Sequence, residues 1–110
     1  MKVRVPPKRV REEFILTCEL KGSQKGIDLL SEHYGVKTMK VILDGRRVGN
    51  GDLGCYYRNK AYFSRKGLNR RNLLHEFFHH LVETQGIEMP ARTEEKGANS
   101  YAKAFFKNCF

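Results

Sequence analysis

The pattern H-E-x-x-H occurs at residues 75–79 and restricts how the chain can fold around it. Residues four apart on an α-helix lie on one face, about 40° apart around the axis. His75 and His79 can therefore direct two imidazoles at one metal ion. Glu76 lies about 100° further round, within reach of a metal-bound water but poorly placed to be a ligand. The pattern predicts a helix that carries a zinc site with one open coordination position.

The residues around this pattern are strongly apolar, which indicates that the helix is buried. They are Leu73, Leu74, Phe77, Phe78, Leu81 and Val82. The alternative is a pair of surface histidines on an ordinary amphipathic helix. Burial favours the metal site, because unpaired polar side chains are costly inside a protein and a metal ion supplies the partner.

A third protein ligand is predicted on the next helix. Glu95 and Asn99 lie four residues apart and share a face. Ala98 and Ala102 are also four apart, and small residues allow two helices to approach closely. This spacing predicts that Glu95 is the third ligand and that Asn99 forms a hydrogen bond with the far nitrogen of a ligating histidine.

Other assignments of the third ligand remain open at this point. Glu95 can be an acidic residue that simply favours the start of a helix through the helix dipole. Glu94 is the reserve candidate for the ligand. His33 and His80 are less favoured, because His80 lies about 140° from His75 on the same helix.

At 110 residues the chain has the size of one domain, sufficient for a core of three or four helices and a small sheet. Asn69 is the predicted cap of the H-E-x-x-H helix, Gly86 its stop, and Thr93 the cap of the last helix. The predicted strands cover 1–5, 36–43, 53–58 and 60–64, and the predicted helices cover 8–20, 27–33, 70–85 and 94–106.

The chain is basic, with 21 Lys and Arg against 12 Asp and Glu and a net charge of +9. Such a balance favours anionic partners, among them nucleic acid, but because the basic residues are spread along the chain a solvated surface is the preferred explanation. The sequence contains no run of five or six basic residues.

Three widely spaced cysteines, Cys18, Cys55 and Cys109, form no C-x-x-C pair. Their odd number, together with the lack of a signal peptide, predicts a reducing cytoplasm. No stretch approaches the 18 or so apolar residues that a membrane span needs.

The H-E-x-x-H pattern followed by a glutamate on the next helix resembles the gluzincin metallopeptidases, and in so short a chain the minigluzincins of the proabylysin and projannalysin type. Residues 36–102 also resemble the IrrE/ImmA peptidases, in which a Tyr-rich hairpin precedes the metal helix and an E-x-x-A-N motif follows it. The chain differs from IrrE/ImmA in having Phe78 where a glycine is usual. It is also expected to have no separate sensor or DNA-binding domain after Phe110.

This resemblance implies a single minimal catalytic domain, 1–110, with an α+β fold in which a three-stranded sheet packs against the H-E-x-x-H helix. It implies a zinc endopeptidase with one Zn²⁺ held by His75, His79 and Glu95, and Glu76 as the general base. An edge strand would pair with an extended peptide or protein substrate. From chain position, that strand is predicted at Ala61, Tyr62, Phe63 and Ser64.

Some minigluzincins are latent through a C-terminal segment. By analogy, Cys109 or the carboxylate of Phe110 is predicted to be able to fill the open zinc position, since thiolates and carboxylates are good zinc ligands. The alternative for Cys109 is a small apolar residue at a frayed end.

Two competing functions remain. One is a basic, nucleic-acid-associated module in which zinc is structural, and the other is an IrrE/ImmA-like peptidase that acts on DNA-bound regulators. Association into a homodimer is also expected to be accessible to so small a chain.

Overall fold

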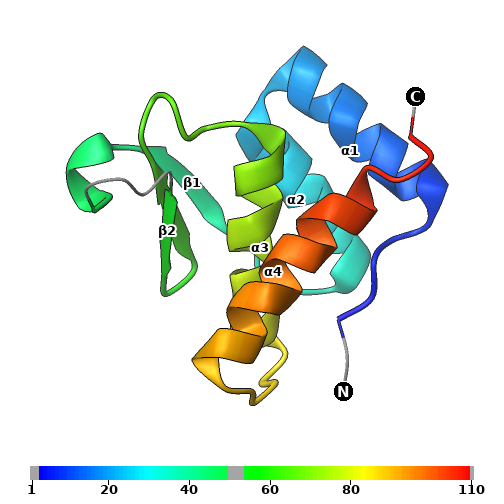
Figure 1. Ribbon diagram of the computed structural model, residues 1–110. Helices are drawn as coiled ribbons and strands as arrows, with labels where there is room; N and C mark the ends of the chain where they lie inside the picture. Colours follow the sequence, from blue (N-terminus) through cyan, green and yellow to red (C-terminus); the bar gives the residue numbers. More distant parts are fainter. Residues whose placement is uncertain (1–2, 50–53, 110) are drawn as a thin grey trace.

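The α+β fold predicted from the sequence is confirmed by the computed structural model, which describes residues 3–49 and 54–109 (Figure 1). Within these ranges the chain forms four α-helices, one short 3₁₀ helix and three strands. In chain order they are α1 (Lys8–Lys21), α2 (Ser23–Tyr34), β1 (Lys40–Leu43), η1 (Gly45–Arg47), β2 (Gly54–Tyr57), β3 (Lys60–Phe63), α3 (Arg70–Thr84) and α4 (Ala91–Phe105). The described residues 3–7, which include part of the strand predicted at 1–5, form no strand.

The sheet has the strand order β1-β3-β2, with β1 parallel and β2 antiparallel to β3. The prediction that Ala61–Ser64 forms the edge strand is therefore wrong. Residues 60–63 form the central strand, because β1 pairs with one side of β3 and β2 with the other. Among the described residues, β1 and β2 are the edges.

A two-residue turn joins β2 to β3, as the predicted hairpin requires. Arg58 and Asn59 both have positive φ angles, 43° and 66°. Two consecutive residues of this kind match the twist of antiparallel strands, and Asn adopts this conformation more readily than most residues.

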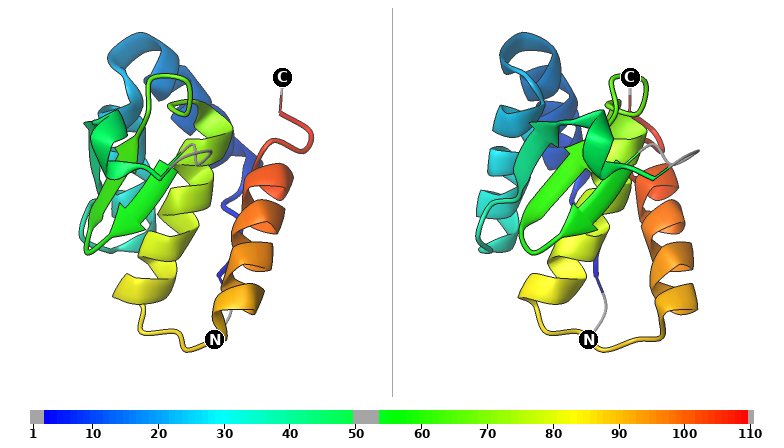
Figure 2. Two further views of the ribbon diagram at one scale, coloured as in Figure 1. Left: turned by 60° about the vertical axis from the view of Figure 1, so that its left-hand side comes forward. Right: turned by 90° about the vertical axis from the view of Figure 1, so that its left-hand side faces the viewer.

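The helix α3 lies at the centre of the molecule, between the sheet and α4 (Figure 2). Its apolar residues are buried on several sides of the helix, which confirms the burial expected from its flanking sequence. The largest fully buried side chains of the core are Phe14, Ile27, Leu30, Met39, Phe63, Leu73, Leu74, Phe77, His80, Leu81 and Phe105. No helix in the described part of the chain is both long and apolar enough to cross a bilayer.

The ends of α3 are those predicted from local sequence. The Asn69 side chain accepts a hydrogen bond from the Asn72 backbone N–H at 2.9 Å, which satisfies one of the unpaired donors of the first turn. At the other end the chain turns at Gly86, with a positive φ of 64°.

The start of α4 differs from its prediction. The helix begins at Ala91, so Thr93 lies inside its first turn and is not the cap. Pro90 is the N-cap residue, with a φ of −60° and a ψ of 148°, and no side chain caps this end of the helix.

Close approach of α3 and α4 depends on Gly97. A Cβ atom at Gly97 would lie 2.7 Å from Cζ of Phe78, closer than carbon atoms tolerate. Ala98 and Ala102, the small residues noted in the sequence, are also buried. The ring of Phe78 on α3 thus occupies the space that a side chain at position 97 of α4 would need.

We predict that Gly97→Leu destabilises the fold by about 1–3 kcal/mol, because it overfills the space occupied by Phe78. Urea unfolding should show a lower midpoint. Lys96→Leu, at the exposed neighbouring position, should change stability by less than about 0.5 kcal/mol. Adding Phe78→Ala to Gly97→Leu should cost less than the sum of the two single changes. Equal midpoints for wild type and Gly97→Leu would show that this contact does not limit helix spacing.

Candidate metal centre

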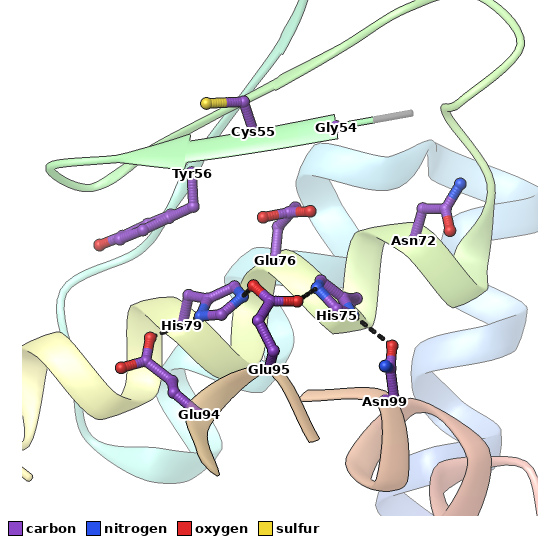
Figure 3. Close-up of a pocket in the computed structure, with 10 residues that line it drawn as sticks. All are labelled: Gly54, Cys55, Tyr56, Asn72, His75, Glu76, His79, Glu94, Glu95 and Asn99. Carbon is purple, nitrogen blue, oxygen red and sulfur yellow. Dashed lines mark hydrogen bonds and ion pairs between the residues drawn. The ribbon is translucent and has the colours of Figure 1, made fainter. Parts of the chain in front are cut away.

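A pocket opens between β2, α3 and the first half of α4 (Figure 3). It brings together residues that lie far apart in the sequence. Its lining consists of Gly54, Cys55, Tyr56, Asn72, His75, Glu76, His79, Glu94, Glu95 and Asn99. The three predicted ligands, the predicted general base Glu76 and the predicted partner Asn99 are all in this group.

Three side chains form a potential metal-binding group within the pocket. His75, His79 and Glu95 each offer one ligand atom, and these atoms all lie within 4.8 Å of one another. One carboxylate oxygen of Glu95 is 3.1 Å from Nε2 of His75, and the other is 2.9 Å from Nε2 of His79. The Glu95 side chain is 59% exposed, whereas the two histidines are largely covered. The group therefore faces the solvent side of the pocket.

The far nitrogens of both histidines are held by α4. Nδ1 of His75 is 2.9 Å from Oδ1 of Asn99, and Nδ1 of His79 is 2.5 Å from Oε2 of Glu94. Because these oxygens accept hydrogen bonds, each Nδ1 carries the hydrogen. Glu94, the reserve ligand, thus lies behind a histidine, and Asn99 has the partner predicted for it.

The resulting arrangement fits a bound cation. With each Nδ1–H donated to α4, the Nε2 atoms of His75 and His79 point at the Glu95 carboxylate. A cation placed among these two nitrogens and the carboxylate would contact all three side chains. Two imidazole nitrogens and a carboxylate are a donor set that zinc accepts, with each histidine held at its other nitrogen. Metal binding itself stays a prediction.

Glu76 lies on the same pocket, between α3 and β2 (Figure 3). Its residue is only 7% exposed. A Cβ atom at Gly54 would lie 3.3 Å from Oε2 of Glu76 and 3.0 Å from the Phe63 ring. Gly54 therefore leaves the space into which the Glu76 carboxylate fits. Gly54 is one of several glycines in this part of the sequence. No local pattern indicates that it lies beside Glu76, which follows it by 22 positions.

A group of hydrogen bonds that could not be predicted from the sequence connects β2 to α3. The Tyr56 hydroxyl lies 2.9 Å from Nδ1 of His80 and 2.9 Å from Oε1 of Glu83. Nε2 of His80 is 2.5 Å from the carbonyl oxygen of Lys37. Burial raises the pKa of Tyr56 and lowers the pKa of His80, and both shifts favour the neutral side chains. His80 is thus a structural residue and not part of the metal-binding group.

Other predicted site residues lie elsewhere. The side chains of Ala61 and Phe63 are buried on the inner face of the sheet. None of the four residues 61–64 lines the pocket. The reason is the central position of β3, which leaves β2 next to the pocket.

Cys109 does not reach the pocket either, so the prediction that its thiol fills the open position is wrong. Sγ of Cys109 lies 3.5 Å from Nη1 of Arg11 and 3.6 Å from the carbonyl oxygen of Phe105. These contacts hold the tail against α1, beyond the end of α4 opposite to Glu95. Phe110 lies outside the described residues.

No protein-family model matches the chain, and comparisons with curated proteins and with solved structures gave no match. The geometry of the pocket is therefore the basis for assigning a function.

We predict that the chain binds about one Zn²⁺, a single open site with three protein donors. Dialysis against zinc followed by elemental analysis should show this ratio. His75→Ala, His79→Ala and Glu95→Ala should each lose the metal, whereas Glu88→Ala, an exposed residue outside the pocket, should keep it. Zinc bound equally well by Glu95→Ala would rule out this glutamate as the third ligand.

The residues behind the histidines should also affect zinc affinity. Asn99→Ala and Glu94→Ala are each expected to weaken zinc binding about 10- to 100-fold, since each leaves a histidine without the partner that orients it. Competition with a zinc-binding dye would measure the dissociation constants. Wild-type affinity in both variants would show that these contacts do not position the ligands.

Proposed function

We propose that this protein is a zinc-dependent endopeptidase of the gluzincin type. The observation that carries the proposal is the shared pocket of the three donors and Glu76. Structural zinc sites usually have four protein ligands, mostly cysteines. Here the group has three members, and the sulfur of Cys55 points away from them (Figure 3). A three-donor site beside a carboxylate is typical of a catalytic zinc site.

The resemblance to the minigluzincins and the IrrE/ImmA peptidases supports the same proposal. Its E-x-x-A-N motif corresponds to Glu95, Ala98 and Asn99. In the structure Glu95 lies between the two histidines, Ala98 is buried, and Asn99 contacts His75. The bulk of Phe78, which departs from the IrrE/ImmA pattern, is balanced by Gly97.

In the proposed reaction the chain supplies acid–base chemistry and orientation. When bound, zinc would act as a Lewis acid on the attacking water and on the scissile carbonyl. Glu76 accepts the proton of that water and then donates it to the leaving amine. Gly54 leaves room for the Glu76 carboxylate beside β2, because a Cβ atom at this position would lie 3.3 Å from Oε2 of Glu76. Asn99 and Glu94 keep both imidazoles in the tautomer that directs Nε2 into the pocket.

We infer that the substrate lies along β2 and not along residues 61–64. Gly54, Cys55 and Tyr56 line the pocket, and β2 is an edge strand of the described sheet. An edge strand has unpaired backbone N–H and C=O groups, to which an extended peptide can add as a further strand. The hydrogen bonds of the Tyr56 hydroxyl with His80 and Glu83 fix the position of this strand relative to α3.

We further propose that the protein works in the cytoplasm. Cys18, Cys55 and Cys109 are all free thiols, which supports a reducing compartment. Burial raises the pKa of Cys18 to about 11, so this thiol is protonated and unreactive.

We predict that Glu76→Gln lowers the rate of peptide cleavage at least about 100-fold, because the amide cannot accept the proton of the attacking water. A quenched-fluorescence peptide library would measure cleavage. Zinc content should stay at the wild-type level, since Glu76 is not a ligand.

Two controls make this test decisive. Glu88→Gln makes the same chemical change at an exposed position and should cleave at the wild-type rate. Removal of zinc with a chelator should abolish cleavage, and zinc should restore it. Cleavage by Glu76→Gln at the wild-type rate, or cleavage that survives zinc removal, would exclude the proposed reaction.

A further inference from the structure

The positive charge of this protein is concentrated in one part of the chain. Residues 36–71 contain ten of the 21 Lys and Arg but only two of the 12 Asp and Glu, so they carry +8 of the net charge of +9. The rest of the chain is therefore nearly neutral in net charge. Most of this segment forms the sheet and its connections, at one end of the molecule (Figure 1), and Arg70 and Arg71 begin α3.

The outer face of the sheet, turned away from α3, carries two cross-strand rows of side chains. Neighbouring residues across paired strands share a face. One row is Lys40, Lys60 and Tyr57, and the other is Ile42, Tyr62 and Cys55. We call this surface, with Arg47 and Arg58 beside it, the outer sheet face. No α-helix of the described residues covers it (Figure 2).

Aromatic rings and cationic groups are interleaved on the outer sheet face. The guanidinium of Arg47 lies over the Tyr62 ring at 5.6 Å, and that of Arg58 lies over the Tyr57 ring at 5.2 Å. Tyr57 is 60% exposed, an unusual position for a large ring. Asp44, the acidic residue that follows β1, is paired with Arg46 at 3.0 Å.

We propose that the outer sheet face binds single-stranded nucleic acid. Lys40, Lys60 and the two arginines would contact phosphates, and unpaired bases would stack on Tyr57 and Tyr62. Stacking on exposed aromatic rings in a positively charged surface is the general means by which proteins hold single strands without sequence preference. Stacking on these rings requires unpaired bases, which a single strand offers and a duplex does not, so single strands fit this face better than double-stranded DNA.

This site is separate from the candidate metal centre. Successive residues of a strand point to opposite faces, so the side chain of Tyr57 points outward while that of Tyr56 points to the pocket. Of the residues of the outer sheet face, Cys55 also borders the pocket, whereas Tyr57, Tyr62 and the four cations do not. The proposal therefore goes beyond the proposed peptidase and does not depend on it. Glu76→Gln should bind nucleic acid with the wild-type affinity even though it cleaves no peptide.

Fluorescence anisotropy with a labelled 15-nucleotide oligo(dT) tests the proposal. Wild type should bind with a log–log salt slope of about −3, as four phosphate contacts predict for a single strand. Tyr57→Ala and Tyr62→Ala should each weaken binding about fivefold or more. Arg47→Gln and Lys60→Gln, which retain both tyrosine rings, should each reduce the slope by about 0.7.

Matched control variants distinguish binding at the outer sheet face from attraction by the overall positive charge of the protein. Lys21→Ala and Lys103→Ala remove one charge each from exposed positions on α1 and α4 and should change affinity less than about twofold. Circular dichroism would confirm that the tyrosine variants are folded, and the arginine and lysine variants test the site independently of them.

Three results would overturn the proposal. The first is an equal loss of affinity in the Lys21 and Lys103 controls. The second is a duplex of the same length that binds as tightly as the single strand. The third is a polyglutamate of equal charge that competes as well as the oligonucleotide, which would indicate an acidic peptide as the partner.

Discussion

The contact between α3 and α4 is the constraint on which the candidate metal centre depends. Helix α3 supplies His75 and His79, but α4 supplies the third donor and both residues that hold the histidines at Nδ1. Gly97 lets the two helices approach closely enough for Glu95 to reach both imidazoles. The packing of the two helices therefore determines the geometry of the site, because a small change in helix spacing would move Glu95 away from both histidines.

The small sheet contributes in a different way, by separating two chemical surfaces. Its inner face packs on α3 and positions Gly54 over the Glu76 carboxylate. Its outer face carries exposed rings and cations. Alternation along β2 is the physical reason, since each residue of a strand points to the face opposite to its neighbour's. The contacts of Tyr56 with His80 and Glu83 hold this strand in place for both surfaces.

Local patterns were sufficient to predict α3, the hairpin and the facing positions on α4. The cap at Asn69, the stop at Gly86 and the spacing of His75 and His79 each depend on residues within a few positions of one another. The strand order could not be predicted in this way, because β1 and β3 are parallel partners separated by 16 residues or more. The same limitation applies to Cys109, for which the sequence left two positions open, because its partner Arg11 lies near the other end of the chain.

The sequence alone determined which chemistry the chain can offer: two histidines and a glutamate on one helix, and a glutamate and an asparagine one turn apart on the next. These features are local, so helical and strand periodicity reveals them directly. Only the tertiary structure decided which glutamate lies between the histidines, which strand borders the pocket, and that positive charge shares a face with two tyrosines. Those outcomes depend on packing between distant segments, which no single stretch of sequence encodes.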